Sequence, residues 1–226
     1  MNKMTIVIGI FICLGVIYCS TGKSKEQSPG IQDNMELVVE PGVNWFSKMK
    51  VFLFFYKNNS PQLAAWIEDK DGNYISTIAI SEKSAKRNWI SAPKEGRPEA
   101  LPVWSHRQLN FSVTDDLNAV SSATVKGSFE AKIDKGSLVN GNTYNVFLEI
   151  NHSFDYNDFW TKNNSGVNGQ PSLVYYAQFV AGQNGSKSLD PIGYGSVDGS
   201  NGNIIRNLEN FTTALNIVHD ATIVVK

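Results

Sequence analysis

The chain has 226 residues, of which 42% are hydrophobic and 18% are charged, and its formal net charge is −1. This composition is typical of a globular protein and excludes a chain that is disordered along most of its length. The near-neutral charge offers no basic field to attract nucleic acid, so we expect no nucleic-acid partner.

The first 18 residues predict a signal peptide. Lys3 gives the chain a positive start, and residues 5–18 form a continuous apolar run that is too short to cross a bilayer comfortably. Cys19 follows, and the polar residues 20–34 after it predict a flexible tether. An apolar run, one Cys and a polar tether together resemble a bacterial lipoprotein signal, despite the bulky Tyr18 before the Cys.

The lipoprotein resemblance implies that Cys19 carries a lipid that tethers the protein to a membrane. The protein would then reside in the bacterial cell envelope, in the periplasm or attached to the outer membrane. A plain signal peptide and an uncleaved N-terminal anchor are the alternatives. We therefore expect a signal peptide at residues 1–18, a lipidated Cys and tether at residues 19–34, and a single domain at residues 35–226.

Cysteine usage agrees with export but predicts no disulfide. The two Cys residues, Cys13 and Cys19, both lie in or directly after the leader. The remaining sequence therefore has no thiol for a disulfide, a zinc ligand or a nucleophile. Removing residues 1–18 takes away one Lys and no acid, which leaves a charge of 19 − 21 = −2.

The body of the chain predicts β-structure. Runs rich in β-branched and aromatic residues predict strands at residues 35–40, 51–56, 63–68, 74–80, 128–133, 143–150, 171–180 and 217–225, with the run 51–56 buried on both faces. Asp71-Gly72 predicts the turn of a hairpin over residues 62–80, and we expect this block to pair with residues 128–150.

The intervening segments predict loops. We expect irregular structure at residues 81–108 and 182–202. A further short strand is expected at residues 109–113, and a short helix or another strand at residues 203–216. With many strands and no long amphipathic helix, the sequence predicts an all-β fold, an immunoglobulin-like antiparallel β-sandwich with long loops.

The loop after residues 143–150 contains the richest cluster of polar and aromatic side chains: His152, Asp155, Tyr156, Asp158 and Trp160. One interpretation is a ligand site at the mouth of the sandwich, because loops commonly carry function. The simpler interpretation, which we favour, is a turn whose Asp and Asn side chains bond their own backbone above packed aromatic rings.

Other candidate sites are weaker. Asp69, Asp71 and Asn73 have the spacing that begins a calcium loop, but their hairpin context favours a turn. The three His residues are far apart in sequence, so we expect no metal site. Trp104 and His106, with Trp160, are candidates for a sugar- or flavin-stacking surface. We identify no catalytic set, and the sequence favours a non-enzymatic protein.

Four segments resemble a known family when they are taken in order. They are AWIEDKDGNYISTI at residues 65–78, LPVWSH at residues 101–106, NAVSSAT at residues 118–124 and GNTYNVFLEI at residues 141–150. Together they resemble the predicted periplasmic proteins of domain-of-unknown-function family 2271. The resemblance implies an exported, immunoglobulin-like β-sandwich linked to extracytosolic flavin-transfer and redox proteins, which would be its partners.

The family link gives residues 118–127 a sharper interpretation. The run AVSSAT resembles the motif of proteins that carry FMN through a phosphoester bond to a Thr hydroxyl, which implies Thr124 as the attachment site. Asn118 stands where that motif has an acid, and Ser122 where it has Gly. The alternative is a small-residue turn before the strand at Ser128. We expect a membrane-tethered binding protein, with an FMN carrier and a carbohydrate-binding module or hydrolase as alternatives.

Overall fold

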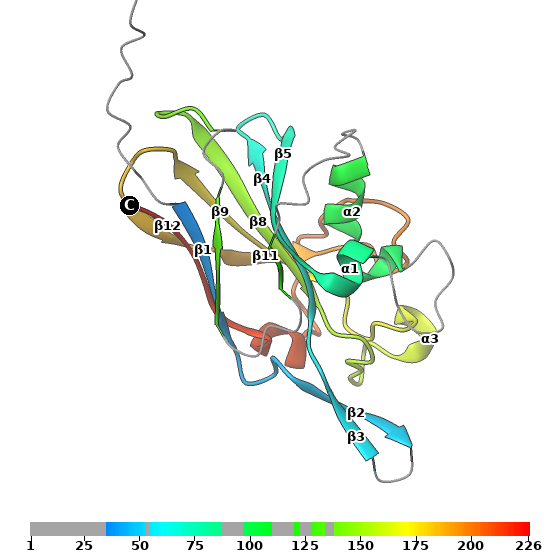
Figure 1. Cartoon of the computed structure of the whole chain (residues 1–226). Helices are drawn as coiled ribbons and strands as arrows, with labels where there is room; N and C mark the ends of the chain where they lie inside the picture. The colour runs from blue at the N-terminus through cyan, green and yellow to red at the C-terminus, as the bar shows by residue number, and fades with distance from the viewer. Residues whose placement is uncertain (1–34, 53–54, 87–96, 110–119, 123–127, 134–137) are drawn as a thin grey trace, which may run out of the picture. The chain divides into compact units, whose positions relative to one another are not determined.

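The computed structural model describes residues 35–52, 55–86, 97–109, 120–122, 128–133 and 138–226. These residues belong to one compact unit, which runs from Gln32 to Lys226. Their strands form a four-stranded and a six-stranded sheet, with a separate two-stranded ribbon (Figure 1). The two larger sheets enclose a common hydrophobic core, which confirms the predicted all-β sandwich. The expectations for Cys19 and Thr124 lie outside the described residues.

The four-stranded sheet has the order β10-β12-β1-β7. Its strands are β1 (Met35–Pro41), β7 (Phe129–Lys132), β10 (Gly185–Ser188) and β12 (Val218–Val225). Strand β1 pairs antiparallel with β12 on one side and with β7 on the other. Buried and less buried residues alternate along β1, so Leu37 and Val39 reach the core while Glu36 and Glu40 do not.

The six-stranded sheet has the order β11-β9-β8-β4-β5-β6. Its strands are β4 (Gln62–Asp69), β5 (Tyr74–Ser81), β6 (Val120–Ser122), β8 (Thr143–Asn151), β9 (Leu173–Val180) and β11 (Asp190–Tyr194). The pairs are antiparallel except β5–β6, which is parallel. The predicted hairpin is confirmed as β4–β5, and β4 pairs with β8 as expected.

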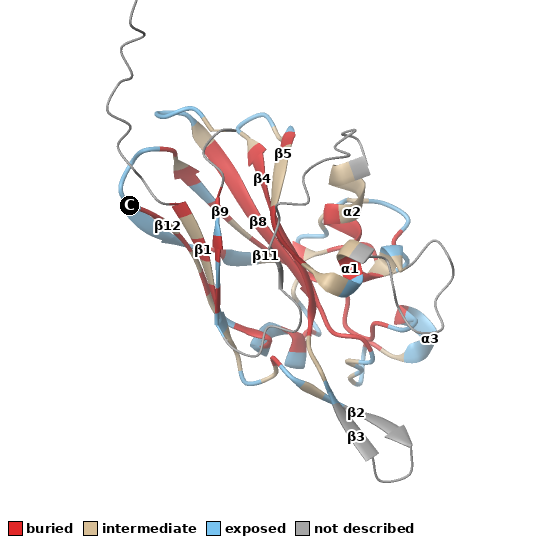
Figure 2. Cartoon of the chain, in the orientation of Figure 1, coloured by how far each residue is buried: buried red, intermediate tan, exposed pale blue. Residues whose placement is uncertain are grey.

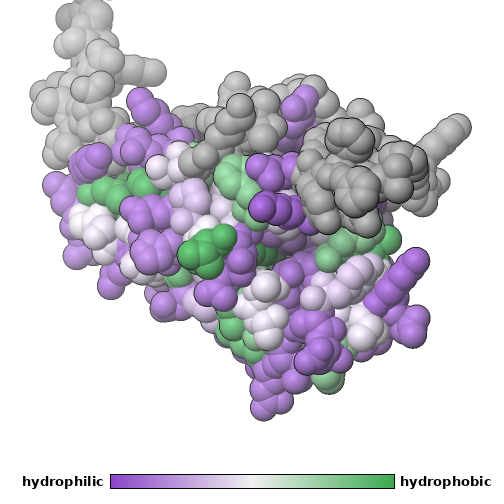
Figure 3. Space-filling model, turned by 90° about the horizontal axis from the view of Figure 1, so that it is seen from below, coloured by the Kyte–Doolittle hydropathy of each residue, from purple (hydrophilic) through white to green (hydrophobic). Residues whose placement is uncertain are grey.

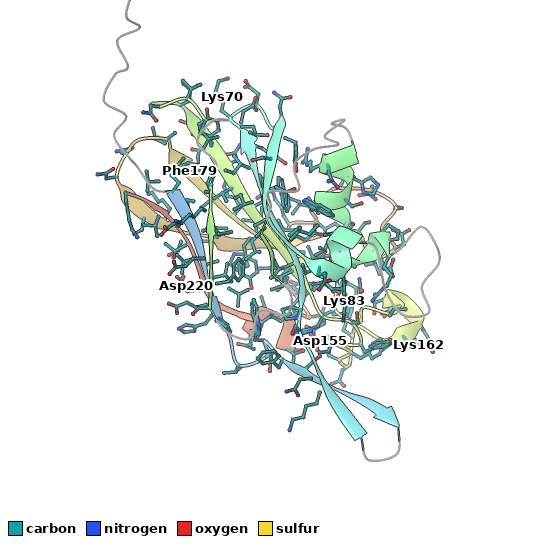
Figure 4. The ribbon with its side chains drawn as sticks, in the orientation of Figure 1. Lys70, Lys83, Asp155, Lys162, Phe179 and Asp220 are labelled. Atoms are coloured by element: carbon teal, nitrogen blue, oxygen red, sulfur yellow. The ribbon has the colours of Figure 1, made fainter. Side chains whose placement is uncertain are left out.

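The turn between β4 and β5 uses the carboxylate that would begin a calcium loop. The Asp69 side chain accepts hydrogen bonds from the backbone N–H of Asp71 at 2.8 Å and of Asn73 at 2.9 Å. The side-chain hydrogen bond from Asn73 is the main reason that the pKa of Asp69 is lowered. Gly72 has φ 84°, the left-handed conformation that favours glycine. Figure 4 labels the neighbouring Lys70 at this end of the sandwich.

The middle strands of the six-stranded sheet are buried on both faces. In β4 and β8, nearly all residues are buried, whether they point toward the other sheet or away from it (Figure 2). Residues on the inner face, such as Leu63, Leu148 and Leu173, join the core between the sheets. The outer face carries a second cluster around Trp66 and Phe147. This double burial requires that something covers the outer face.

The strand register arranges the outer face in rows across β4, β8 and β9. The rows are Gln62 with Asn151; Ala64 with Glu149 and Val174; Trp66 with Phe147 and Tyr176; and Glu68 with Asn145 and Gln178. Trp66 and Phe147 stack with ring centroids 5.1 Å apart, and Phe147 and Tyr176 are also 5.1 Å apart. Polar rows therefore border an aromatic row.

Short helices cover and border this face, which corrects the prediction of an irregular segment at residues 81–108. They are α1 (Glu82–Lys86), the 3-10 turn η1 (Pro98–Ala100) and α2 (Pro102–Leu109). Leu109 ends α2 and so does not begin the strand expected at residues 109–113. None of the helices in the described ranges is long and apolar enough to cross a membrane.

Three other segments also differ from expectation. The segment at residues 182–202 contains β10 and β11, since backbone pairing does not require an apolar sequence. By contrast, the segment at residues 203–216 contains the short 3-10 helix η3 (Thr213–Asn216), in agreement with the short helix that was one of the two alternatives expected there. Val120–Ser122 in the small-residue stretch is strand β6, paired with β5. The aromatic run at residues 51–56 is divided between β2 (Ser47–Phe52) and β3 (Phe55–Asn59) and does not form one strand.

Candidate functional site

Helix α2 lies on the outer face of the six-stranded sheet, and a carboxylate from the sheet holds its first turn. The fully buried Glu149 side chain accepts the backbone N–H of Val103 at 3.2 Å and of Trp104 at 2.8 Å. Ser172 Oγ donates a third hydrogen bond to Glu149 at 2.7 Å. The first N–H groups of a helix have no partner inside it, so Glu149 acts as a helix cap supplied by a distant strand.

The surroundings of Glu149 are closely packed. A Cβ at Gly195 would lie 2.5 Å from Pro102 Cγ, 2.8 Å from Ser172 Oγ and 3.0 Å from Glu149 Oε1. The loop after β11 can therefore approach the cap only with glycine at this position. Burial raises the pKa of Glu149 to about 7, and the hydrogen bonds from Ser172, Trp104 and Val103 oppose part of the rise.

We expect Glu149 to make stability depend on pH. Its pKa rises from 4.5 in the unfolded chain to about 7 in the folded one, so the folded state binds more protons between these values. The stability contributed by protonated Glu149 is present below pH 4.5 and is lost as the pH rises through 7, by at most about 3 kcal/mol. Urea unfolding of the wild type and of Glu149→Gln at several pH values measures this. The free energy of unfolding of the wild type minus that of the variant should fall as the pH rises. A constant difference would contradict the prediction.

The last turn of α2 is held by a second buried carboxylate. Glu68 in β4 accepts Trp66 Nε1–H at 2.9 Å, and Arg107 Nε of α2 lies 3.4 Å from the same Glu68 oxygen. Burial raises the pKa of Glu68, while the Trp66 hydrogen bond and the Arg107 charge lower it in part. Glu149 and Glu68 thus fix the two ends of α2 to the sheet.

The two sequence-predicted residues in this segment, Trp104 and His106, both lie on α2. Trp104 is buried against the outer face, and its Nε1–H donates to Thr77 Oγ1 at 2.9 Å. His106 Nδ1 lies 2.9 Å from the carbonyl oxygen of Pro102, one turn earlier in the helix. In the structure, Trp104 therefore serves as a packing contact between helix and sheet.

A network around Arg97 joins η1 to the end of β8. The Arg97 guanidinium pairs with Glu99 at 2.8 Å and donates to Ser153 Oγ at 2.7 Å and to Asn168 Oδ1 at 2.5 Å. Gln62 Nε2 donates to the same Ser153 oxygen at 3.0 Å. These groups cross-link segments that are far apart in the sequence, so their arrangement is structural.

Among the described residues near Arg97 and the end of β8, few polar side-chain atoms are left to bind a ligand or a metal. Gln62 Oε1 and Asn151 Oδ1 are buried acceptors in one row of the sheet, without a hydrogen-bond partner among the described residues. The Arg97 guanidinium shares Ser153 with Gln62, and its positive charge disfavours a cation there. In the described ranges, no three His, Asp or Glu side chains are grouped to hold a metal ion.

His152 fastens the end of β8 to the segment before β2. Its Nε2 lies 3.0 Å from the carbonyl oxygens of both Asn44 and Trp45, so this nitrogen carries the proton and donates. Burial lowers the pKa of His152, and the charge of Asp155 opposes the shift. The residue is therefore neutral at pH 7 and acts as a buried donor.

Asp155 fastens the same loop to η3. Its carboxylate accepts a hydrogen bond from Thr213 Oγ1, and its backbone carbonyl accepts one from Gln170 Nε2 at 3.3 Å. Burial raises the pKa of Asp155, while the Thr213 hydrogen bond and the charge of His152 lower it in part. His152 and Asp155 are thus brought together, whereas Asp158 is exposed.

The aromatic residues of this loop divide into two groups. Trp160 is buried among Tyr194, at 5.7 Å, and Phe211, at 5.6 Å between ring centroids. The expectation of packed rings is therefore confirmed for Trp160 but not for Phe154 and Tyr156, which are exposed; Phe159 is also exposed, although its ring contacts Trp160 edge-on at 4.9 Å between centroids. Asn157 Oδ1 accepts the backbone N–H groups of Phe159 and Trp160 at 3.0 and 2.7 Å, as the turn interpretation predicted.

Most exposed large apolar side chains in the described ranges belong to three loops, which we call the loop surface. Its members are Val43, Phe46, Phe154, Tyr156, Phe159, Val167 and Leu215, whereas the exposed Val139 and Ile205 lie elsewhere. Val43 is 89% exposed and Phe154 52% exposed. Figure 3 views this end of the sandwich and shows hydrophobic groups separated by hydrophilic ones.

Hydrogen bonds hold the three loops of the loop surface together. Asn44 N donates to the Asn216 carbonyl at 3.0 Å, and Asn157 Nδ2 donates to the Asn210 carbonyl at 2.8 Å. A Cβ at Gly42 would lie 2.2 Å from the Asn216 oxygen, which shows how closely these segments approach. The loop surface is therefore built on fixed joints.

Phe154 has a backbone conformation that a bulky residue rarely adopts. Its φ is 65°, and its N–H donates to the Val167 carbonyl at 2.8 Å. Such a conformation costs free energy in a non-glycine residue and often marks a position under functional constraint. Because about half of its surface is exposed, Phe154 gains only part of the free energy that a buried Phe contributes to the monomer.

Sequence reasoning located some of these residues but missed the ones that fix α2. Trp104 and His106 lie on α2, which covers the outer face of the six-stranded sheet. The other predicted residues lie in the loop that follows β8: His152, Asp155, Tyr156 and Trp160. Glu149, Glu68 and Arg97 were not singled out. A carboxylate at Glu149 inside the apolar run 143–150 is a signal that points to a buried partner.

The chain matches no family model, no curated protein and no solved structure at a significant level.

Proposed function

We propose that this chain is an exported, membrane-tethered β-sandwich binding protein that contacts its partner through the loop surface. The observation that carries the proposal is the concentration of exposed apolar side chains on three hydrogen-bonded loops at one end of the sandwich. Apolar side chains gathered at one end of a protein, and not scattered evenly over its surface, favour an interaction site there. The lipid on Cys19 and the link to extracytosolic flavin and redox proteins belong to the same proposal and rest on the sequence resemblances.

The backbone at Phe154 supports this assignment independently. A residue with φ 65° is commonly Gly or Asn, yet here it is a half-exposed Phe. Replacing Phe154 by Asn should leave stability unchanged or slightly higher, because Asn tolerates this conformation. An aromatic residue kept at a strained, solvent-facing position is consistent with a ring that contacts something outside the chain.

The test replaces Phe159 by a photo-cross-linking amino acid. The full chain is expressed in cells of the organism that naturally makes this protein. We expect a discrete cross-linked species, with its yield reduced at least several-fold by the double variant Val43→Ser, Phe154→Asn. The matched control is Val139→Ser, Ile205→Ser, which removes exposed apolar side chains outside the loop surface. Equal yields in the two double variants, or no species at all, would refute the proposal.

A further inference from the structure

Asn followed directly by Gly occurs four times in the chain, at Asn140, Asn168, Asn184 and Asn201. Such a pair can cyclise: the backbone nitrogen of Gly attacks the side-chain carbonyl carbon of Asn, because Gly has no Cβ to obstruct the approach. The reaction needs a Gly nitrogen that is free of hydrogen bonds and an Asn side chain that lies in solvent. The hydrogen bonds of the fold therefore decide which pair reacts.

The first two pairs are protected by their own contacts. Gly141 N donates to the Ala181 carbonyl oxygen at 2.8 Å, so the nitrogen that would attack is engaged. Asn168 is only 1% exposed, and its side chain accepts a hydrogen bond from Arg97 and donates one to the Glu99 carbonyl oxygen at 2.6 Å. The first pair therefore lacks a free nitrogen, and the second lacks a free side chain.

The pair at Asn184 is exposed but its glycine belongs to a sheet. Gly185 begins β10 and lies opposite Val225 of β12. In the same ladder, Leu189 N donates to the Ala221 carbonyl oxygen at 2.7 Å. Hydrogen-bonded pairs recur at every second residue of an antiparallel ladder, so the Gly185 N–H faces the Val225 carbonyl oxygen. This pair, too, has no free nitrogen.

The pair at Asn201 meets both requirements. Asn201 is exposed, and the Gly202 N–H donates to no acceptor in the described ranges. Asn201 Oδ1 accepts the backbone N–H of Asn203 at 3.0 Å, which folds the side-chain carbonyl back over the intervening Gly202 peptide. This hydrogen bond also draws electrons from the carbonyl carbon and makes it a better electrophile. The nitrogen that must leave, Asn201 Nδ2, donates to the exposed Ser200 Oγ at 3.1 Å.

Gly202 also packs against α2. A Cβ at Gly202 would lie 2.6 Å from His106 Cβ, and a Cβ at Gly199 would lie 2.5 Å from Glu99 N in η1. Figure 1 shows the chain beyond β11, in orange, beside α2. Main chain that fits so closely against its neighbours has no room for an additional atom.

We propose that Asn201 is a site of spontaneous modification, at which the side-chain amide is lost and the main chain beside α2 is rerouted. Gly202 N bonds to Asn201 Cγ, the Cγ–Nδ2 bond breaks, and the Gly202 amide proton leaves with Nδ2 as ammonia. Water then opens the resulting succinimide ring at either of its two C–N bonds. Opening at Cγ gives aspartate, and opening at the backbone carbonyl gives isoaspartate, whose main chain runs through Cγ.

Isoaspartate lengthens the main chain by one methylene group and adds a carboxylate directly before Gly202. We expect the contact between Gly202 and His106 to open and α2 to exchange its amide hydrogens faster, while Glu149 continues to hold the first turn of the helix. This modification lies on the outer face of the six-stranded sheet and does not depend on the proposed partner of the loop surface.

The test incubates the full chain in mildly alkaline buffer, either folded or unfolded in urea, and then digests it with trypsin. The peptide 188–206, released by cleavage after Lys187 and Arg206, contains Asn201. Mass spectrometry follows the replacement of its amide NH₂ by OH, and labelling by an isoaspartyl methyltransferase identifies isoaspartate. In the folded chain we expect Asn201 to convert at least several-fold faster than the other three pairs, and in urea we expect four similar rates.

Two variants link the modification to α2. In the wild type and in the matched control Asn184→Gln, hydrogen exchange of α2 should rise several-fold as the incubation proceeds, whereas in Asn201→Gln it should stay constant. Conversion of another pair as fast as Asn201 in the folded chain, or no conversion at Asn201, overturns the assignment of the site. The same course of exchange in both variants overturns the effect on α2.

Discussion

Replacing Glu149 by alanine is expected to lower the free energy of unfolding by about 4 kcal/mol. The change leaves the N–H groups of Val103 and Trp104 and the hydroxyl of Ser172 without their acceptor. A buried donor left unpaired costs about 1–3 kcal/mol. The loss is smaller than three such costs, because removing the carboxylate also removes the free energy spent on burying it.

Urea unfolding followed by circular dichroism measures this loss, and Glu149→Gln is the control. The amide oxygen still accepts from the helix, but its NH₂ group faces donors, so we expect an intermediate loss of roughly 1–2 kcal/mol. Hydrogen exchange of the Val103 and Trp104 amides should rise in Glu149→Ala beyond the global effect. An alanine variant as stable as the wild type would show that the helix cap is dispensable.

Replacing Trp66 by alanine is expected to cost about 3–5 kcal/mol, the range for removing a buried aromatic ring. Trp66 is fully buried, stacks on Phe147 with an interplanar angle of 11° and donates to Glu68. The change opens a cavity beneath α2 and removes the Trp66 hydrogen bond to the buried Glu68 carboxyl, which keeps the ion pair with Arg107 at 3.4 Å.

Trp66→Phe separates these two effects. It keeps most of the ring volume and loses the indole N–H, so we expect a smaller loss of roughly 1–3 kcal/mol. Because a lost donor raises the pKa of Glu68 further, the Trp66→Phe variant should gain relative stability as the pH falls. Equal losses in both variants, measured by urea unfolding, would indicate that the ring itself contributes little.

The β-sandwich was predictable because the sequence patterns that indicate its strands and turns involve residues close together in the chain. The alternation in β1 and the Asp-Gly turn of β4–β5 depend on neighbouring residues, which period-two reasoning captures. The burial of β4 and β8 on both faces also appears in the sequence as nearly continuous apolar runs. These signals determine strands and one hairpin, but not which strands border one another.

Helix α2 was not predictable in this way. Its buried apolar residues, Pro102, Val103 and Trp104, all lie in the first turn, and its cap comes from Glu149, which is 45 residues away from Trp104. No local pattern contains such a partner. The loop surface was missed for a related reason: the aromatic rings of the loop after β8 were expected to pack beneath it, and only the folded loop shows that Phe154 and Phe159 are about half exposed.

The distant helix cap also bears on the order in which the chain folds. An isolated helix of eight residues is unstable in water, so we expect α2 to be largely unformed until the Glu149 carboxylate can accept its first N–H groups. That acceptor requires β8, and the Ser172 bond requires the segment that leads into β9. We therefore infer that α2 forms late, after a chain closure of 45 residues, and that its presence reports a completed sheet.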